Sequence, residues 1–378
     1  MRILADENIP GVEAYFGDIA TAISYAPGRA INTAQVAACD LLLVRSVTPV
    51  NASLLQQHRP QFIGSATIGI DHIDVECLAK QQIPFAHAPG CNADAVGDYV
   101  LAALLYVHAD APQRLADKTV SVIGAGNVGG RLVKRLRALG ITVRVCDPPR
   151  AEQTPEAEAF VTLADAMQAD VVCVHTPLTG EGAHPTRQLI SDSMLSLLPQ
   201  NAVLLNAGRG AVVSAGALER FLPQRPDVQV VLDVWEPEPD IPRILLPQVR
   251  LATGHIAGYS LEGKWRGTQM LRAALNRVYP EYDRPLPDMA TFLPPAPRIV
   301  VLDDDPWQAL YDSVEAVYDI AQDDRRFRLA MRAEEPARAF DQYRKTYVQR
   351  REIQQCRVLV QESPARPLLR AAGFQIPS

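Results

Sequence analysis

The chain has 378 residues, of which 48% are hydrophobic and 21% are charged, and its net charge is −6 at pH 7. This composition is typical of a globular protein with two or three domains and excludes a disordered chain. The negative charge argues against a general nucleic-acid binder, and the longest apolar run, residues 101–107, is too short to cross a bilayer. We therefore expect no nucleic-acid partner and no membrane partner.

Six cysteines lie far apart in the sequence, and none of them forms a C-x-x-C pair. This spacing argues against a zinc site or a disulfide framework and favours a reducing compartment. The first ten residues, MRILADENIP, place two acids where a signal peptide needs an apolar core. We therefore expect a cytoplasmic protein without a bound metal.

Short apolar runs alternate with helical patterns through most of the chain, which is typical of an α/β fold with parallel sheets. In the first part, strands are expected at residues 2–5, 41–44, 62–65 and 83–86, followed by a buried helix at 93–108. In the second part, strands are expected at 119–123, 142–146, 170–174, 202–206, 228–232 and 250–253, with helices at 128–139 and 261–278. Six prolines between residues 279 and 306 predict a linker, and residues 307–378 predict a small α or α+β appendage.

A glycine triplet, Gly124-x-Gly126-x-x-Gly129, directly follows one predicted strand and begins a helix. Such a triplet alone is weak evidence, because glycines also mark turns. Here the context is that of a dinucleotide site, with a tight turn, a close approach of the backbone to a pyrophosphate, and close packing of helix on strand. The next strand ends in Asp147, whose carboxylate would bind ribose hydroxyls and favour NAD over NADP, although nearby Arg150 could weaken that preference.

Three further residue types follow later strands of the series, where ligands collect in doubly wound sheets. They are Arg209, Glu238 and His255. Oxidation of an alcohol beside a carboxylate needs a planar cation to bind the acid and a base to take the hydroxyl proton. A carboxylate would orient the imidazole, and spacing alone does not choose between Glu236 and Glu238 for that role. His175 also ends a strand, and we interpret it as structural.

The strings HTPLT, N-x-G-R-G and D-V-W-E-P-E-P occur in this order between residues 175 and 239. With them, residues 1–280 resemble the NAD-dependent D-2-hydroxyacid dehydrogenases. The resemblance implies two Rossmann-like, doubly wound parallel-sheet domains plus a small C-terminal α+β appendage. The substrate domain would be discontinuous, residues 1–92 and 256–285, around a dinucleotide-binding domain at 93–255, with a C-terminal dimerisation domain at 286–378 that forms a homodimer.

The resemblance also implies roles for individual residues. Arg209, Glu238 and His255 would be catalytic, which selects Glu238 over Glu236. The implied NAD-binding residues are Gly124, Gly126, Asn127, Val128, Gly129, Asp147, Thr176, Ala207, Gly208, Arg209, Asp233 and Gly258, and the implied substrate-binding residues are Ser46, Thr67 and Tyr259.

Within the family, the string GHIAGYSLEGKWRGT and the extra C-terminal segment resemble the members that oxidise 4-phospho-D-erythronate in pyridoxal 5′-phosphate biosynthesis. Two alternatives stay open, an enzyme acting on D-3-phosphoglycerate and an NAD-sensing corepressor. Gly254 stands where the family usually has a proline, which predicts a more mobile loop before His255. Candidate cations for the substrate phosphate are Arg45, Lys264, Arg266, Arg344–Lys345 and Arg350–Arg351.

Overall fold

The computed structural model describes residues 1–301, 303, 305–348, 350–360 and 363–377. The chain divides into two compact units, one made of Met1–Asn92 with Ser260–Pro295 and the other of Ala93–Tyr259 with Ala296–Ser378. Among the described residues, no helix has the length and apolar character that a membrane span requires.

The first unit is built on a five-stranded parallel sheet with strand order β2-β1-β3-β4-β5. Its strands are β1 (Arg2–Asp6), β2 (Ala22–Ala26), β3 (Leu41–Val44), β4 (Phe62–Ser65) and β5 (Phe85–His87). Four of them were expected, whereas β2 was missed. This strand lies at the edge of the sheet and only its last residue is buried, so it lacks the apolar run that marks a central strand.

Short helices and one long helix cover this sheet. The short ones are α1 (Val12–Phe16), α2 (Thr33–Ala37), α3 (Ala52–Leu55) and α4 (Val75–Lys80). The long helix α11 (Leu261–Val278) begins at Ser260, whose hydroxyl accepts the Gly263 N–H at 2.9 Å and so caps the helix. Its buried Leu271 and Leu275 join Phe62 of β4 in one apolar core.

Arg272 lies on the same helix and is buried, yet all five of its N–H donors find acceptors. Its two terminal nitrogens reach Asp18 at 2.6 and 2.9 Å and the carbonyls of Tyr15 and Tyr282 at 2.8 and 2.7 Å. Its Nε donates to Asn276 at 2.7 Å. One guanidinium therefore ties α11 to the loop after α1 and to the segment beyond the helix.

The second unit is built on a six-stranded parallel sheet with strand order β11-β10-β9-β8-β6-β7. Its strands are β6 (Thr119–Ile123), β7 (Thr142–Cys146), β8 (Val171–Val174), β9 (Val203–Asn206), β10 (Gln229–Leu232) and β11 (Leu251–Ala252), as the sequence predicted within one or two residues. Phe160 forms an isolated parallel β-bridge with Val145 of β7. The order of strands reverses between β6 and β8, which is where doubly wound sheets bind ligands.

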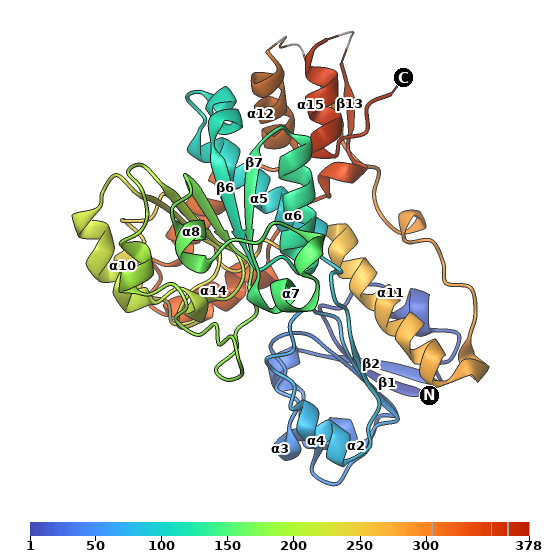
Figure 1. The fold of residues 1–378 in the computed structure, drawn as a ribbon. Coiled ribbons are helices and arrows are strands. Elements are labelled where there is room, and N and C mark those ends of the chain that lie inside the picture. Colours follow the sequence, from blue (N-terminus) through green and yellow to red (C-terminus); the bar gives the residue numbers. More distant parts are fainter. Residues whose placement is uncertain (302, 304, 349, 361–362, 378) are drawn as a thin grey trace. The chain divides into compact units, whose positions relative to one another are not determined.

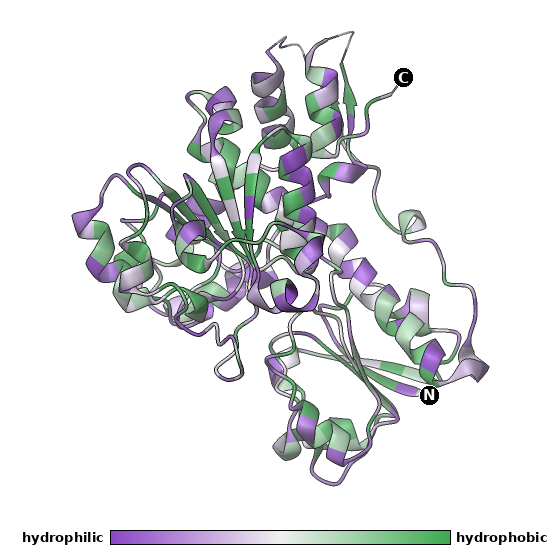
Figure 2. Ribbon diagram, in the orientation of Figure 1, coloured by the Kyte–Doolittle hydropathy of each residue, from purple (hydrophilic) through white to green (hydrophobic). Residues whose placement is uncertain are grey.

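Alternating side chains of this sheet enter two separate cores. Val171 and Cys173 of β8 join the core with α5 (Ala93–Val107) and α6 (Asn127–Ala138). Val172 and Val174 join a core that includes residues of α8 (Leu163–Met167), α9 (Asp192–Leu195) and α10 (Ala215–Phe221). The sheet is therefore buried on both faces, as the hydrophobic strands in Figure 2 and the helices around them in Figure 1 show.

The C-terminal segment belongs to the same compact unit as this sheet. Its elements are β12 (Arg298–Val300), α12 (Pro306–Val317), α13 (Ile320–Ala330), α14 (Pro336–Lys345), β13 (Arg357–Leu359) and α15 (Ala365–Ala372). Strands β12 and β13 pair in parallel, so part of the stretch that its prolines suggested was a linker is a strand. Helices α12 and α13 contact α5, and α15 contacts α6.

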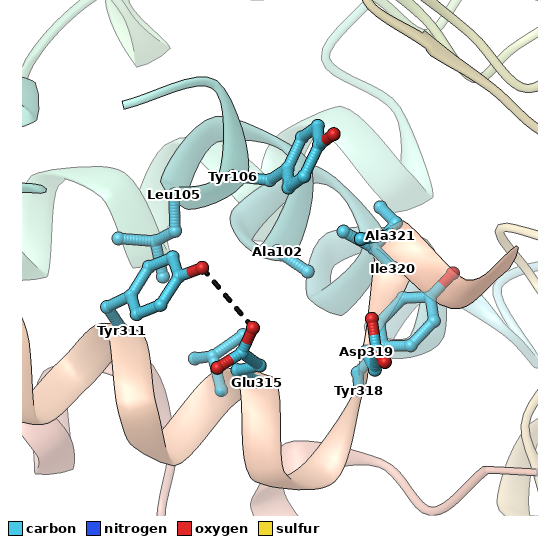
Figure 3. Close-up of a pocket in the computed structure, with 10 residues that line it drawn as sticks. Ala102, Leu105, Tyr106, Tyr311, Glu315, Tyr318, Asp319, Ile320 and Ala321 are labelled. Atoms are coloured by element: carbon cyan, nitrogen blue, oxygen red, sulfur yellow. Dashed lines mark hydrogen bonds between the residues drawn. The ribbon is translucent and has the colours of Figure 1, made fainter. Parts of the chain in front are cut away.

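A small, open pocket marks the contact between α5 and the C-terminal helices (Figure 3). Leu105 and Tyr106 line it from α5, and Tyr311 and Glu315 line it from α12, where the Tyr311 hydroxyl donates to the Glu315 carboxylate at 3.3 Å.

We expect Arg272→Met to lower the free energy of unfolding by about 2–4 kcal/mol, because it leaves buried acceptors without donors. Chemical denaturation of the variant and the parent measures the difference. The matched control is Arg220→Met, since Arg220 also binds an aspartate, Asp192, through two nitrogens but on the exposed surface. Equal effects of the two substitutions would show that burial of Arg272 adds nothing.

Candidate active site

The glycine turn joins β6 to α6 at the point where the strand order reverses. Gly124 has a φ of +85°, and a Cβ on Gly129 would lie 1.9 Å from the Gly124 carbonyl oxygen. A Cβ on Gly126 would meet no atom within 4 Å, and no side chain caps α6 there. The first turn of α6 thus presents amide groups to open space, the arrangement that binds a phosphate.

Asp147 follows β7 and lies against this turn. One carboxylate oxygen accepts the Ala125 N–H at 2.8 Å, and the other accepts the Arg150 N–H at 3.1 Å, which caps the short helix α7 (Pro148–Gln153). The Arg150 guanidinium donates to the Ala125 carbonyl. The structure therefore brings Asp147 and Arg150 to the glycine turn. Asp147 is the residue that was expected to bind the ribose hydroxyls of a dinucleotide.

The residues that follow β8 lie close to the same turn. A Cβ on Gly124 would approach Thr176 to 2.9 Å. The Thr176 hydroxyl and both ring nitrogens of His175 are buried, and none of these atoms has a hydrogen-bond partner within the described part of the chain. Burial lowers the pKa of His175 to about 4, so its ring is neutral, as a structural role requires.

Arg209 lies on a loop that the buried Asn206 shapes at the end of β9. The Asn206 amide donates to the Arg209 carbonyl at 3.0 Å, and its oxygen accepts the Gly208 N–H at 3.1 Å. The Arg209 guanidinium donates to the Gly208 carbonyl at 3.0 Å. Gly208 fits tightly against β8, since a Cβ there would lie 3.2 Å from the Val174 carbonyl oxygen.

Asp233 holds the loop that carries His255. Its carbonyl accepts the His255 N–H at 2.6 Å, and its carboxylate accepts the N–H groups of Ile256 and Ala257 at 2.8 and 2.9 Å. The same carboxylate accepts the Thr253 hydroxyl at 2.7 Å. His255 has a φ of +59°, a conformation that few residues other than glycine adopt, and these bonds hold it there.

Glu238 and His255 form a direct pair, with 2.8 Å between Oε2 and Nδ1. The other oxygen of Glu238 accepts the Trp235 N–H at 2.9 Å. Burial alone would raise the pKa of Glu238, but His255, Arg344 and the Trp235 N–H together lower it. The carboxylate is therefore ionised, and because an ionised carboxylate can only accept, Nδ1 of His255 is the donor in this contact.

Glu236 binds elsewhere. Its carboxylate accepts the Ala215 N–H at 3.2 Å, at the start of α10. The geometry thus pairs Glu238, and not Glu236, with His255, a choice that spacing alone left open.

Two polar residues that the sequence analysis did not single out complete the support of this loop. Tyr99 of α5 donates to the Thr253 hydroxyl at 2.8 Å, because that hydroxyl already donates to Asp233. The Trp235 ring nitrogen donates to the Thr253 carbonyl at 2.8 Å. Tyr99 and Trp235 are both large aromatic residues in apolar stretches, so the sequence suggests only that they pack in the core. No signal in the sequence predicts their hydrogen bonds to Thr253.

Two of the expected substrate-binding residues belong to the first unit. Ser46 follows β3, and Thr67 follows β4, so both lie at the carboxyl edge of the five-stranded sheet. The Thr67 hydroxyl lies 2.6 Å from the Ser65 hydroxyl and donates to the Gly69 carbonyl at 2.8 Å. These bonds shape the loop of Thr67, one of the residues that were expected to bind the substrate.

The candidate phosphate cations differ in their surroundings. Arg350 is buried, and its Nη2 donates to the carbonyls of Ala95 and Ala257, so it is an internal cation rather than a surface one. Arg45 donates to the Asn8 carbonyl at 3.0 Å, and Arg266 donates to the Cys91 carbonyl. None of these contacts assigns the phosphate.

The residues present fit a dinucleotide, since open space over Gly126 and a buried, unbonded Thr176 hydroxyl face the same turn as Asp147. Gly258 and Tyr259 follow directly on the loop that Asp233 holds. Within the described ranges, no three His, Cys, Asp or Glu side chains gather into a possible metal site.

Comparison with known proteins agrees with this geometry. Residues 106–257 match the NAD-binding domain of the D-isomer specific 2-hydroxyacid dehydrogenases, and residues 294–373 match a domain of unknown function, DUF3410. The chain is 46% identical to erythronate-4-phosphate dehydrogenase of Marinobacter nauticus, over 100% of both chains. It is 48% identical to the enzyme of that name from Azotobacter vinelandii, over 99% of this chain and 100% of the other.

Among solved structures, NAD⁺-bound 3-phosphoglycerate dehydrogenase of Entamoeba histolytica superposes with a TM-score of 0.62 at 20% identity, over 74% of this chain and 96% of that one. This likeness shows the fold. Identity over the whole length shows more: the chain belongs to the erythronate-4-phosphate dehydrogenase family, within the NAD-dependent D-isomer specific 2-hydroxyacid dehydrogenases.

Proposed function

We propose that this chain oxidises 4-phospho-D-erythronate to 3-hydroxy-2-oxo-4-phosphooxybutanoate with NAD, a step of pyridoxal 5′-phosphate biosynthesis. The observation that carries the chemistry is the 2.8 Å contact of His255 with an ionised Glu238, on a loop of the dinucleotide-binding sheet. The substrate is inferred from the relatives of that name, which match this chain over its whole length.

NAD⁺ supplies the hydride acceptor when it is bound. The first turn of α6, with Gly124, Gly126, Asn127, Val128 and Gly129, would hold its pyrophosphate, and Asp147 its ribose. Thr176 and the loop of Ala207–Arg209 would line the cofactor site, together with Asp233 and Gly258. Three of the approximately four acceptor positions of the Asp233 carboxylate are already used within the loop, which leaves one for a ligand donor.

Arg209 would bind the substrate carboxylate and the neighbouring oxygen through its planar fork. Nε2 of His255 would take the hydroxyl proton as the hydride leaves the same carbon, so that the alcohol loses one hydride and one proton. Glu238 would keep the ring in the required tautomer and stabilise the imidazolium. Ser46, Thr67 and Tyr259 would contact the substrate.

We also propose that the chain forms a homodimer through its C-terminal segment. Val300 of β12 and its register partner Leu359 of β13 are 66% and 42% exposed, so two apolar side chains stand side by side on a small sheet. A second copy of this surface would cover them. The cysteine spacing still supports a cytoplasmic location.

Glu238→Gln tests the catalytic pair. The amide oxygen can still accept from Trp235, but the amide NH₂ then faces Nδ1 of His255 and favours the tautomer with the proton on Nε2. We expect kcat to fall about 10²-fold or more, while NAD affinity stays near that of the parent. Steady-state assays and fluorescence titration measure the two quantities.

Glu236→Gln is the matched control, two residues away on the same loop. It removes the same charge from the residue that binds the Ala215 N–H, so a nearly unchanged kcat is expected. If both substitutions reduced kcat equally, the pairing of His255 with Glu238 would not explain the loss.

The substrate proposal is tested with purified protein, NAD and two acids, 4-phospho-D-erythronate and D-3-phosphoglycerate. We expect kcat/KM to be about 10–200-fold higher for the first, the discrimination that one carbon unit typically provides. Absorbance of the reduced nicotinamide follows both reactions. Preference for the shorter acid would assign the alternative enzyme, and NAD binding without turnover of either acid would favour the corepressor.

The dimer proposal is tested by light scattering. We expect the parent to have twice the 41.3 kDa mass of one chain, and the double variant Val300→Asp, Leu359→Asp to have the mass of one chain. The control is Ile244→Asp, which places the same charge on a residue of the NAD-binding part that is 63% exposed. A parent of single-chain mass would contradict the proposal.

A further inference from the structure

Three side chains of the first unit form a chain of hydrogen bonds at the carboxyl edge of its sheet. Nε2 of His72 lies 3.0 Å from the Ser65 hydroxyl oxygen, which lies 2.6 Å from that of Thr67. The Thr67 hydroxyl in turn lies 2.8 Å from the Gly69 carbonyl oxygen. Ser65 is buried at the end of β4, whereas Thr67 is only partly buried, so a ligand can meet Thr67 but not Ser65.

The Gly69 carbonyl sets the direction of every bond in this chain. A carbonyl can only accept, so the Thr67 hydroxyl donates its one proton to Gly69. The Thr67 oxygen must then accept from Ser65, and the Ser65 oxygen must accept from His72, because each hydroxyl has a single proton. His72 is therefore protonated on Nε2.

The residues at the end of β5 fix the backbone of the same loop. The Ala88 N–H donates to the Thr67 carbonyl at 3.0 Å. Nδ1 of His87 donates to the Ile68 carbonyl, also at 3.0 Å. The position of the Thr67 side chain is thus set by its backbone on one side and by Ser65 and Gly69 on the other.

One hydrogen-bonding position of the Thr67 hydroxyl remains for a ligand. The oxygen has two lone pairs, of which one accepts from Ser65, and its proton binds the Gly69 carbonyl. The remaining lone pair can only accept. Thr67 could donate to an anion of a ligand only if it gave up its bond to Gly69.

The proposed substrate, 4-phospho-D-erythronate, carries few donors. Its carboxylate and its phosphate are anionic, and their oxygens accept hydrogen bonds. Its donors are the hydroxyls on C2 and C3, and the C2 hydroxyl gives its proton to His255 in the proposed reaction. The C3 hydroxyl is therefore the donor that remains for Thr67.

We propose that Thr67 is a specificity-determining residue, whose hydroxyl oxygen accepts a hydrogen bond from the C3 hydroxyl of the substrate. The inference rests on the proposed function, because it takes 4-phospho-D-erythronate as the substrate. An acid that lacks the C3 hydroxyl would leave the last acceptor position of Thr67 without a donor, and it would be oxidised less efficiently for that reason.

The test compares kcat/KM for 4-phospho-D-erythronate and for its 3-deoxy analogue, D-2-hydroxy-4-phosphooxybutanoate, with NAD. The two acids share the carboxylate, the phosphate and the reacting alcohol, so the ratio isolates the C3 hydroxyl. We expect the parent to prefer 4-phospho-D-erythronate, and Thr67→Val to lower this preference about 3–10-fold, the effect of one hydrogen bond between uncharged groups. Thr67→Ser keeps the hydroxyl and should keep the preference.

Thr48→Val is the matched control in the same unit. The Thr48 hydroxyl also donates to a backbone carbonyl, that of Gly28 at 2.9 Å, but it is buried and cannot meet a ligand. Its removal should leave the preference between the two acids as in the parent, even where it lowers kcat/KM for both.

NMR of the imidazole nitrogens tests the direction of the hydrogen bonds independently of activity. The signals of His72 are identified by their loss in His72→Gln. We expect the parent to carry a proton on Nε2 of His72, since the Ser65 hydroxyl can only accept from this ring.

Three results would overturn the inference. A parent that oxidises both acids equally well, or an unchanged preference in Thr67→Val, would mean that Thr67 does not recognise the C3 hydroxyl. A His72 ring without a proton on Nε2 would mean that Ser65 donates to His72 and Thr67 to Ser65, which reverses the chain and leaves no proton for Gly69. Failure of the proposed function is distinguishable, because the parent would then oxidise neither acid.

Discussion

The capture of three consecutive amides by Asp233 is the interaction on which the site depends. The His255 backbone has a φ of +59°, a conformation that costs a residue other than glycine about 1–3 kcal/mol. Such a conformation persists only where surrounding contacts hold the backbone in place. The carbonyl and the buried carboxylate of one residue at the end of β10 provide this determination for His255, Ile256 and Ala257. Because the orientation of the ring follows from the backbone, the contact with Glu238 follows from Asp233 as well.

A parallel doubly wound sheet places such a loop at the end of a strand, but contacts from other elements are needed to hold its conformation. The carboxyl ends of β6 to β11 deliver the glycine turn, Asp147, Arg209 and His255 to one edge. The stiffness comes from residues behind that edge, Tyr99 of α5 through Thr253 and Phe327 of α13 against Gly254. The C-terminal segment is therefore more than an attachment to the family fold, because its helices pack against the loop that carries His255.

The central strands and the glycine turn were predictable because their signals are local, an apolar run or a triplet of glycines. The edge strand β2 and the strand β12 were missed because both are largely exposed and lack a continuous buried apolar run. Arg350 was a candidate cation for the substrate phosphate, yet it is buried over the ring of Tyr318, at 4.1 Å from its centroid. The acceptors that permit its burial come from distant segments, and no local pattern reports them.

Glu236 and Glu238 show the same limit at the scale of two residues. Their side chains are nearly identical in chemistry and the sequence around them repeats, yet one caps α10 and the other binds His255. The difference arises from what each backbone position faces, a helix start on one side and the loop held by Asp233 on the other. The partner of each carboxylate is thus a property of the fold around it, which explains why the resemblance to a family could select Glu238 as the partner of His255, whereas spacing in the sequence could not.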